Sequence, residues 1–277
     1  MQRPRAVVVV PGVVRGGAMA LSVLLAVLVG GPAFALDPGL DVDQYAHTSW
    51  KIREGFAKGA ITSIAQTADG YLWLGTEFGL LRFDGVRTVP WAPPGGQALP
   101  SNWIRDVLAA RDGTLWISTL KGVASWKDGR LNVYAKLADQ SPWRLLEDRE
   151  GVVWIGTFGA PSGRLCAIRE GEAECYGDDG RFGAGVTRVY EDSKGQLWVG
   201  VRSGLWRWRP APPSFYPLSD EPNGVDGVSE DEDGALLVGV RGEIRRLVDG
   251  RTTPYPLLKR PEPFQTRQIL RDRDGGL

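Results

Sequence analysis

The sequence predicts an all-β fold, a β-propeller of four-stranded antiparallel blades that is incomplete, with about five blades and the start of a sixth. Three observations support this prediction. A strand-turn-strand motif recurs about every 41 residues, two glycine turns punctuate most copies, and helical periodicity is absent between residues 40 and 277. A period near 40 is typical of propellers and solenoids, and the missing helical pattern excludes a helical solenoid.

The recurring motif is a charged residue and a glycine followed by apolar residues, usually with tryptophan. Its clearest copies read DGYLWLGT, DGTLWIST and EGVVWIGT, two weaker copies read KGQLWVGV and DGALLVGV, and the chain ends on DGGL. The intervals between the six glycines are 43, 38, 44, 39 and 41 residues, counted over Gly70, Gly113, Gly151, Gly195, Gly234 and Gly275.

Each copy predicts four short strands. An apolar residue stands six positions before each motif glycine, so a first strand should meet the motif strand through a tight Asp-Gly turn. A second hairpin follows, because glycine supplies the positive φ that two-residue turns need. These second turns are Asp84-Gly85, Asp128-Gly129, Glu170-Gly171 and Asp249-Gly250. In the fourth copy the proline-rich stretch 209–213 replaces the turn.

The N-terminus has the features of a secretory signal peptide. Residues 1–35 contain no Asp or Glu, carry three arginines, and reach the small-x-small sequence Ala33-Phe34-Ala35. We therefore expect a signal peptide at 1–35 and a propeller domain at 36–277. The alternative is an uncleaved membrane anchor, although the apolar run 18–30 is short for a bilayer span.

Removal of the leader leaves 30 basic and 33 acidic residues, a net charge of −3 that does not favour nucleic acid.

A propeller must close into a ring, so a chain ending at Leu277 predicts a longer native product with further C-terminal blades. Residues 44–52 (QYAHTSWKI) predict an isolated strand ahead of the first blade, which could pair with a final blade.

Two residue sets have different expected roles. The periodic tryptophans should be scaffold that packs between blades, with each indole N–H reaching a carbonyl; they are Trp73, Trp116, Trp154 and Trp198. Residues that differ between copies at the start of the inner strands are candidates for ligand binding, since Trp and Arg can stack on and hydrogen-bond sugars or anions. These are Asn102, Trp103, Arg105, Trp143, Arg144, Arg188, Asp226 and Arg267.

The two cysteines lie on either side of the third copy's second turn. Counting outward from Glu170-Gly171 places Cys166 opposite Cys175 in a non-hydrogen-bonded pair, the closer kind. An oxidising compartment would allow a cross-strand disulfide, and the alternative is two small buried apolar side chains.

The sequence predicts no catalytic residues, no metal site and no cofactor. His47 is the single histidine, which argues against a Ser-His-Asp or Cys-His arrangement and against zinc. The acidic runs at 230–233 and 272–274 do not form a calcium loop, and phosphate-binding glycine loops are absent.

The repeat resembles the two-component regulator propeller repeat, best in ITSIAQTADGYLWLGTEFGLLRFDG (residues 61–85), and the resemblance extends over residues 45–277. It implies a periplasmic ligand-sensing region that is usually followed by a β-sandwich, a transmembrane helix and a histidine kinase, or sometimes a diguanylate cyclase. None of those output modules occurs in these 277 residues.

The leading hypothesis is an exported, periplasmic sensor of a membrane-bound histidine kinase, which binds a small molecule or glycan and acts as a homodimer in the full-length protein. Membrane attachment would come through a further C-terminal segment. The alternatives are the sensor part of a diguanylate cyclase, a secreted propeller carbohydrate-active enzyme (a lyase or glycosidase), and a protein-interaction scaffold.

Overall fold

The computed structural model describes residues 50, 56–138, 140–159, 161–218, 224–240, 242–256, 266 and 268–270. The predicted signal peptide, His47 and Arg267 lie outside these described residues, as does the predicted strand 44–52 apart from Trp50. Within the described part, no helix is long and apolar enough to cross a membrane.

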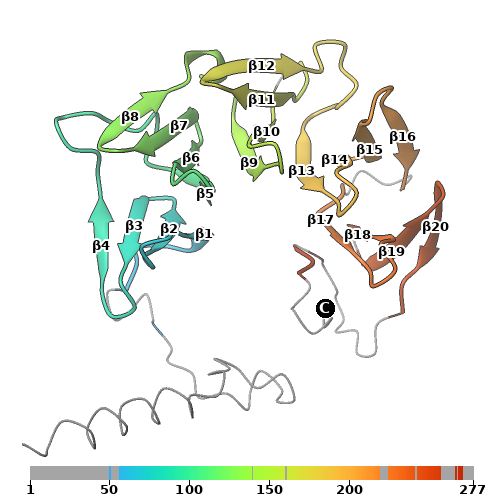
Figure 1. The fold of residues 1–277 in the computed structure, drawn as a ribbon, viewed down its shortest axis with the longest axis horizontal. Helices are drawn as coiled ribbons and strands as arrows, with labels where there is room; N and C mark the ends of the chain where they lie inside the picture. Colours follow the sequence, from blue (N-terminus) through green and yellow to red (C-terminus); the bar gives the residue numbers. More distant parts are fainter. Residues whose placement is uncertain are drawn as a thin grey trace, which may run out of the picture. The chain divides into compact units, whose positions relative to one another are not determined.

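The described residues form five four-stranded antiparallel sheets, named here blades 1 to 5 in chain order, which confirms the predicted fold class (Figure 1). Blade 1 contains β1 (Ile61–Gln66), β2 (Leu72–Thr76), β3 (Gly79–Phe83) and β4 (Thr88–Trp91). Blade 2 contains β5 (Ile104–Ala109), β6 (Leu115–Thr119), β7 (Gly122–Lys127) and β8 (Arg130–Val133), and the short 3-10 helix η3 (Ala135–Leu137) follows it. Blade 3 contains β9 (Pro142–Glu147), β10 (Val153–Thr157), β11 (Leu165–Arg169) and β12 (Glu172–Tyr176). Blade 4 contains β13 (Val186–Glu191), β14 (Leu197–Val201), β15 (Gly204–Arg209) and β16 (Ser214–Pro217). Blade 5 contains β17 (Gly227–Glu230), β18 (Leu236–Val240), β19 (Glu243–Val248) and β20 (Arg251–Pro254).

The two kinds of turn differ in length. In blades 2, 3 and 5 the second hairpins are two-residue turns with positive φ at both positions, as at Asp128 (48°) and Gly129 (78°). The predicted two-residue turn Asp84-Gly85 is wrong, because the four residues 84–87 lie between β3 and β4 and only Gly85 among them has a positive φ (97°). The turn between the first two strands is longer than predicted: in blade 1 it spans the five residues between β1 and β2. There the N–H of Gly70 donates to the carbonyl of Thr67 (2.9 Å), and Gly70 has a φ of 89°.

A glycine in the second strand lets the next blade approach closely. A Cβ atom added to Gly156 would lie 2.6 Å from Cγ1 of Val186, the first residue of β13. Gly75 has the same relation to Ile104 of blade 2 (2.8 Å). In blade 2 the equivalent residue is Ser118, whose hydroxyl donates to the carbonyl of Pro142 (3.0 Å). The glycine of the second strand is therefore set by contact between blades.

The periodic tryptophans are buried between neighbouring blades, and the hydrogen-bond acceptors of their indoles differ from the prediction. Trp154 and Trp198 donate to Oδ2 of Asp148 (2.7 Å) and of Asp192 (2.8 Å), each six residues earlier in the same blade. In blade 1 the acceptor is a hydroxyl, Oγ1 of Thr67, at 3.0 Å from the Trp73 nitrogen. Side-chain oxygens thus take the role that was expected of carbonyls.

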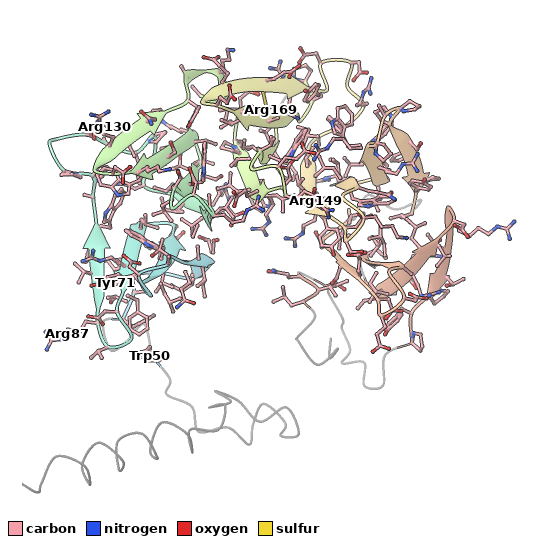
Figure 2. All side chains as sticks on the ribbon, in the orientation of Figure 1. Trp50, Tyr71, Arg87, Arg130, Arg149 and Arg169 are labelled. Carbon is pink, nitrogen blue, oxygen red and sulfur yellow. A yellow bond between two sulfur atoms is a disulfide. The ribbon has the colours of Figure 1, made fainter. Side chains whose placement is uncertain are left out.

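Charged side chains join consecutive blades at the turn between the first two strands. Arg149 of blade 3 pairs with Glu191 at the end of β13 (Nε to Oε1 3.2 Å), and its backbone N–H donates to the same carboxylate (2.8 Å) (Figure 2). Arg111 of blade 2 makes the equivalent pair with Glu147 of blade 3 (3.2 Å). Because the arginines are about half exposed, these pairs are modest in energy, and they link each blade to the next.

Cys166 of β11 lies directly opposite Cys175 of β12, with their Cα atoms 4.0 Å apart, and their sulfur atoms form a disulfide. The short Cα separation is that of a non-hydrogen-bonded pair. Cys166 is fully buried among residues that pack blade 2 against blade 3, so the bridge ties the outer hairpin to the inter-blade core.

Candidate functional site

The candidate site lies where the first strands of blades 2, 3 and 4 begin. A β-bulge interrupts the pairing there in each blade, at Arg105 in β5, at Trp143 in β9 and at Thr187 in β13. A bulge turns two neighbouring side chains toward the same side of a strand. Blades 2 and 3 therefore each present two consecutive polar or aromatic side chains at this end.

The Arg105 guanidinium lies between two tryptophan rings. Its Cζ atom is 4.8 Å from the ring centroid of Trp103 and 4.6 Å from that of Trp143. Arg144 lies against Trp143 from the neighbouring position, at 5.7 Å, and Phe158 packs edge-on against the same ring at 5.4 Å. This stack joins blade 2 to blade 3, and burial against it lowers the pKa of Arg105.

Arg188 extends the basic group into blade 4. Its Nε donates to the carbonyl of Asp226 (3.0 Å), and its Nη2 donates to the same oxygen. Burial, and then repulsion from Arg144, lower the pKa of Arg188 to about 10, while Asp106 and Asp226 act in the opposite direction. Arg188 still carries a full positive charge at neutral pH.

Asp106 is the acidic counterpart of these arginines and joins three blades. Its Oδ1 accepts hydrogen bonds from the Ser63 hydroxyl of blade 1 (2.6 Å) and from its neighbour's backbone N–H, that of Val107 (3.1 Å). Its Oδ2 accepts from the backbone N–H of Leu145 in blade 3 (2.9 Å). Burial raises the pKa of Asp106, although these bonds and the charge of Arg144 oppose the rise.

The arrangement suits a ligand that offers both a flat face and a negative charge. The two tryptophans provide surfaces for stacking, and Trp103 keeps 40% of its surface exposed. The buried Nε atoms of Arg105 and Arg144 have no hydrogen-bond partner within the described residues. Guanidinium groups recognise carboxylate, sulfate or phosphate through paired hydrogen bonds.

The structure brings together six of the eight predicted ligand-binding residues. Asn102 is exposed and takes no part in the contacts above, and Arg267 lies outside the described residues. The brought-together residues are Trp103, Arg105, Trp143, Arg144, Arg188 and Asp226.

The prediction missed Ser63, Asp106 and Phe158. A signal existed for the first two, because the strand register gives Ser63, Asp106, Arg144 and Arg188 the same position in successive blades. Phe158 follows β10 and pairs with Gly185 in an isolated bridge, a long-range contact that the repeat does not reveal. No cluster of three or more potential metal ligands occurs among the described residues.

Comparison with known families identifies the repeat. Residues 55–78, 98–121 and 136–159 match the family described as two component regulator propeller. These segments cover the first two strands of blades 1, 2 and 3. No curated protein matches the chain.

Solved structures share the fold at low sequence identity. Virginiamycin B lyase from Staphylococcus aureus is 15% identical with a TM-score of 0.58, over 72% of this chain and 70% of the lyase. The extracellular domain of a proposed hybrid two component system from B. thetaiotaomicron is 14% identical with a TM-score of 0.53, over 78% of this chain and 36% of that chain. PorZ, a surface component of the type-IX secretion system of Porphyromonas gingivalis, is 14% identical with a TM-score of 0.54, over 74% of this chain and 35% of PorZ. The chain thus spans about a third of the length of the last two proteins.

The motif copies in blades 1 to 3 match one family, and the five blades share one topology. The chain is therefore an all-β propeller protein, three segments of which match the two component regulator propeller repeat.

Proposed function

We propose that this chain is the exported, ligand-sensing propeller of a membrane-bound two-component signalling protein. The observation that carries the proposal is the match of three successive blades to the two component regulator propeller repeat. The likeness to an extracellular domain of a hybrid two component system supports an exported location. The output would be a histidine kinase, and a diguanylate cyclase is the alternative output.

The ligand would bind at the Trp103–Arg105–Trp143 stack. Its two indole faces and the neighbouring guanidinium groups of Arg144 and Arg188 favour a small molecule or glycan with an acidic group. Binding there would touch blades 2, 3 and 4 together, and so could bias a conformational equilibrium passed to the output module and its dimer.

The deciding experiment uses the full-length gene at its own locus. Cells with and without residues 56–270 are exposed to a panel of neutral and uronic-acid oligosaccharides, and the transcriptional response is recorded. The proposal expects the deletion to abolish a response that the intact protein gives. A response of equal size in the deletion strain would contradict it.

A second experiment tests the location of the ligand. The purified exported chain is titrated by calorimetry with an oligogalacturonate and with a neutral malto-oligosaccharide of equal length. Arg105→Gln should weaken binding of the acidic oligomer at least tenfold. Arg87→Gln, the same change on the outer hairpin of blade 1 (Figure 2), is the matched control and should leave binding unchanged.

A secreted lyase is the second candidate, favoured by the structural likeness to virginiamycin B lyase. A catalytically inactive form of that lyase has a histidine replaced by alanine. This chain has one histidine, His47, ahead of blade 1. Cleavage of a streptogramin or a glycan by the purified chain, lost in His47→Ala, would favour the lyase over the sensor.

A further inference from the structure

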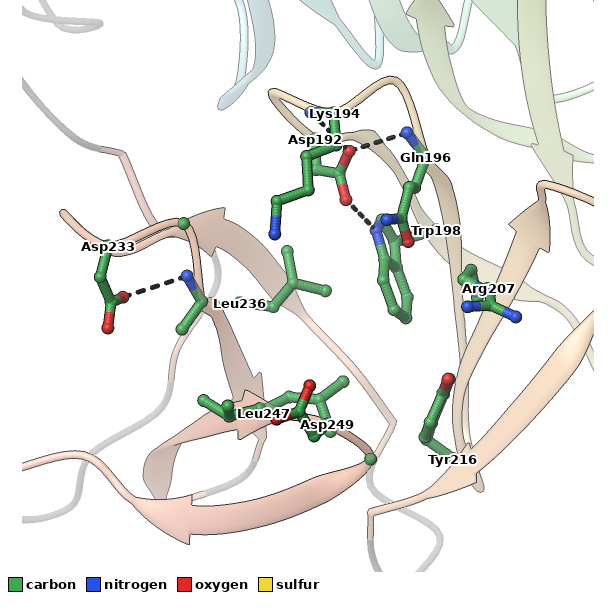
Figure 3. A pocket seen from close by; sticks show the side chains of 14 residues that line it. Asp192, Lys194, Gln196, Trp198, Arg207, Tyr216, Asp233, Leu236, Leu247 and Asp249 are labelled. Atoms are coloured by element: carbon green, nitrogen blue, oxygen red, sulfur yellow. Dashed lines mark hydrogen bonds between the residues drawn. The ribbon is translucent and has the colours of Figure 1, made fainter.

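The interface between two consecutive blades is called a seam here. The seam between blades 4 and 5 contains a cavity of about 360 Å³ (Figure 3). It lies at the turns between strands, over different residues from the candidate site described above. Trp198, Asp192 and Lys194 of blade 4 line it on one side, and Leu247 and Asp249 of blade 5 line it on the other. Its volume is in the range of small-molecule sites.

The seam between blades 3 and 4 is built from equivalent residues, but there the space is filled. Arg209 of blade 4 lies over the Trp154 ring, with its Cζ atom 5.2 Å from the centroid. Its Nη2 is 2.7 Å from Oδ2 of Asp148, and its Nη1 is 3.1 Å from Oε2 of Glu150. The protein thus holds a guanidinium group between an indole face and two carboxylates.

A β-bulge explains why only one of these seams is filled. Strand β15 has an extra residue between the partners of Leu197 and Trp198, so both Trp208 and Arg209 reach blade 3. Strand β19 pairs with β18 without a bulge and places Leu247 opposite Leu236. Blade 5 therefore lacks the inserted residue that would cover Trp198.

The indole and the carboxylate that would hold a guanidinium group are nevertheless present in the seam between blades 4 and 5. Asp192 is buried and accepts the indole N–H of Trp198 at Oδ2 (2.8 Å), as Asp148 accepts that of Trp154. The Oδ2 atom of Asp148 accepts a second hydrogen bond, from Arg209. Asp192 lines the cavity, which lies where the equivalent arginine would be. Among the described residues no guanidinium or ammonium group lies over the Trp198 ring.

We propose that the cavity between blades 4 and 5 binds a guanidinium group, which stacks on Trp198 and donates to Oδ2 of Asp192 as Arg209 does one seam earlier. A planar guanidinium fits this combination better than an ammonium, because it stacks on an indole and presents paired N–H groups.

The cavity differs from the filled seam in the charge of two residues on its wall. Arg207 stands opposite Trp198 where blade 3 has Ala167 opposite Trp154, and its Nη2 donates to the Ser214 hydroxyl (3.2 Å). Lys194 stands where blade 3 has Glu150, two positions after the buried aspartate in both blades. A lysine near a bound cation weakens binding, whereas Glu150 bonds to the Arg209 guanidinium. Asp233 at the opposite wall is paired with Arg246. The site should therefore bind weakly, and Lys194→Glu should strengthen it.

The test is calorimetric titration of the exported chain with L-argininamide. L-Citrullinamide, which is neutral and of nearly equal shape, and L-lysinamide are the matched ligands. L-Argininamide should bind at one site at least tenfold more tightly than either. Equal binding of citrullinamide or lysinamide, or no binding of argininamide at millimolar concentration, would overturn the proposal.

Three variants locate the site. Lys194→Glu should tighten argininamide binding at least threefold. Leu247→Arg should abolish it, because the new side chain occupies the cavity, whereas Leu247→Met keeps the volume and should leave it unchanged. Thermal unfolding shows whether Leu247→Arg still folds. Lys194→Glu gives an independent answer, since a decrease or no change in affinity contradicts the geometry.

Discussion

The Nη2 atom of Arg209 in blade 4 lies 2.7 Å from Oδ2 of Asp148 in blade 3, a carboxylate whose side chain has no exposed surface. The same oxygen accepts the indole N–H of Trp154. One buried charge therefore holds the tryptophan of its own blade and the arginine of the next. Because the charge is buried, its stability in the folded protein depends on both partners.

Removing this arginine should destabilise the propeller. Arg209→Ala leaves the Asp148 carboxylate buried without its cation and exposes the Trp154 face, so we expect a loss of about 3 kcal/mol in the free energy of unfolding. Urea denaturation followed by tryptophan fluorescence measures it. Arg202→Ala, at an exposed position of the same blade, is the control and should change stability by less than about 0.5 kcal/mol. Equal stability of the two variants would show that the pair contributes nothing.

The same carboxylate makes stability depend on pH. Burial alone would raise the pKa of Asp148, but the hydrogen bonds from Trp154 and Val152 and the charge of Arg209 outweigh it and lower the pKa. A carboxyl group with a folded-state pKa below the unfolded value of about 3.9 stabilises the fold above that value. This contribution is lost as the pH falls through the folded-state pKa. The melting temperature should therefore drop as the pH falls below about 4, and less steeply in Asp148→Asn than in the parent chain; parallel curves would contradict the assignment.

A methyl group at the glycine of the second strand should be costly. In Gly156→Ala the new Cβ would lie 2.6 Å from Cγ1 and 3.1 Å from the carbonyl oxygen of Val186. The strand must shift, at a cost of about 1–3 kcal/mol. Gly159→Ala is the matched control three residues later, since its Cβ would meet nothing closer than 3.6 Å. Denaturation midpoints compare the two, and a control as unstable as Gly156→Ala would refute the steric explanation.

The sequence predicted the blades because each of them repeats the same local signals. Glycine after Asp128 forms a turn with positive φ, and the consecutive apolar residues around Trp116 form a strand buried on both faces. These signals depend only on neighbours in the chain. The partners of the tryptophans were predicted less well, since Asp148 and Thr67 lie across a turn whose length the Asp-Gly pattern did not reveal.

The sequence predicted which residues belong to the candidate site, but not which of them contact one another. Variation between copies pointed to Arg105 and Trp143, but the stacking of one on the other depends on how blade 2 faces blade 3. The role of Asp106 also comes from contacts 43 residues backward and 39 residues forward in the chain, to Ser63 and Leu145. The repeat contains no information about such partners beyond the equivalence of positions.

The cross-strand disulfide leads to a prediction about the exported protein. Cys166 and Cys175 close a short loop across the Glu170-Gly171 turn, and Cys166 is buried in the core between blades 2 and 3. The denatured protein, purified after export, should release no titratable thiol until reductant is added, and two thiols afterwards. Closing such a loop stabilises a fold by about 2 kcal/mol, so Cys166→Ala/Cys175→Ala should unfold at lower urea concentration than the oxidised parent chain. The reduced parent chain is the control and should lose a similar amount. Two thiols in the exported protein without reductant would mean that the pair remains reduced, and the double variant would then differ from the parent only by the volume lost at Cys166.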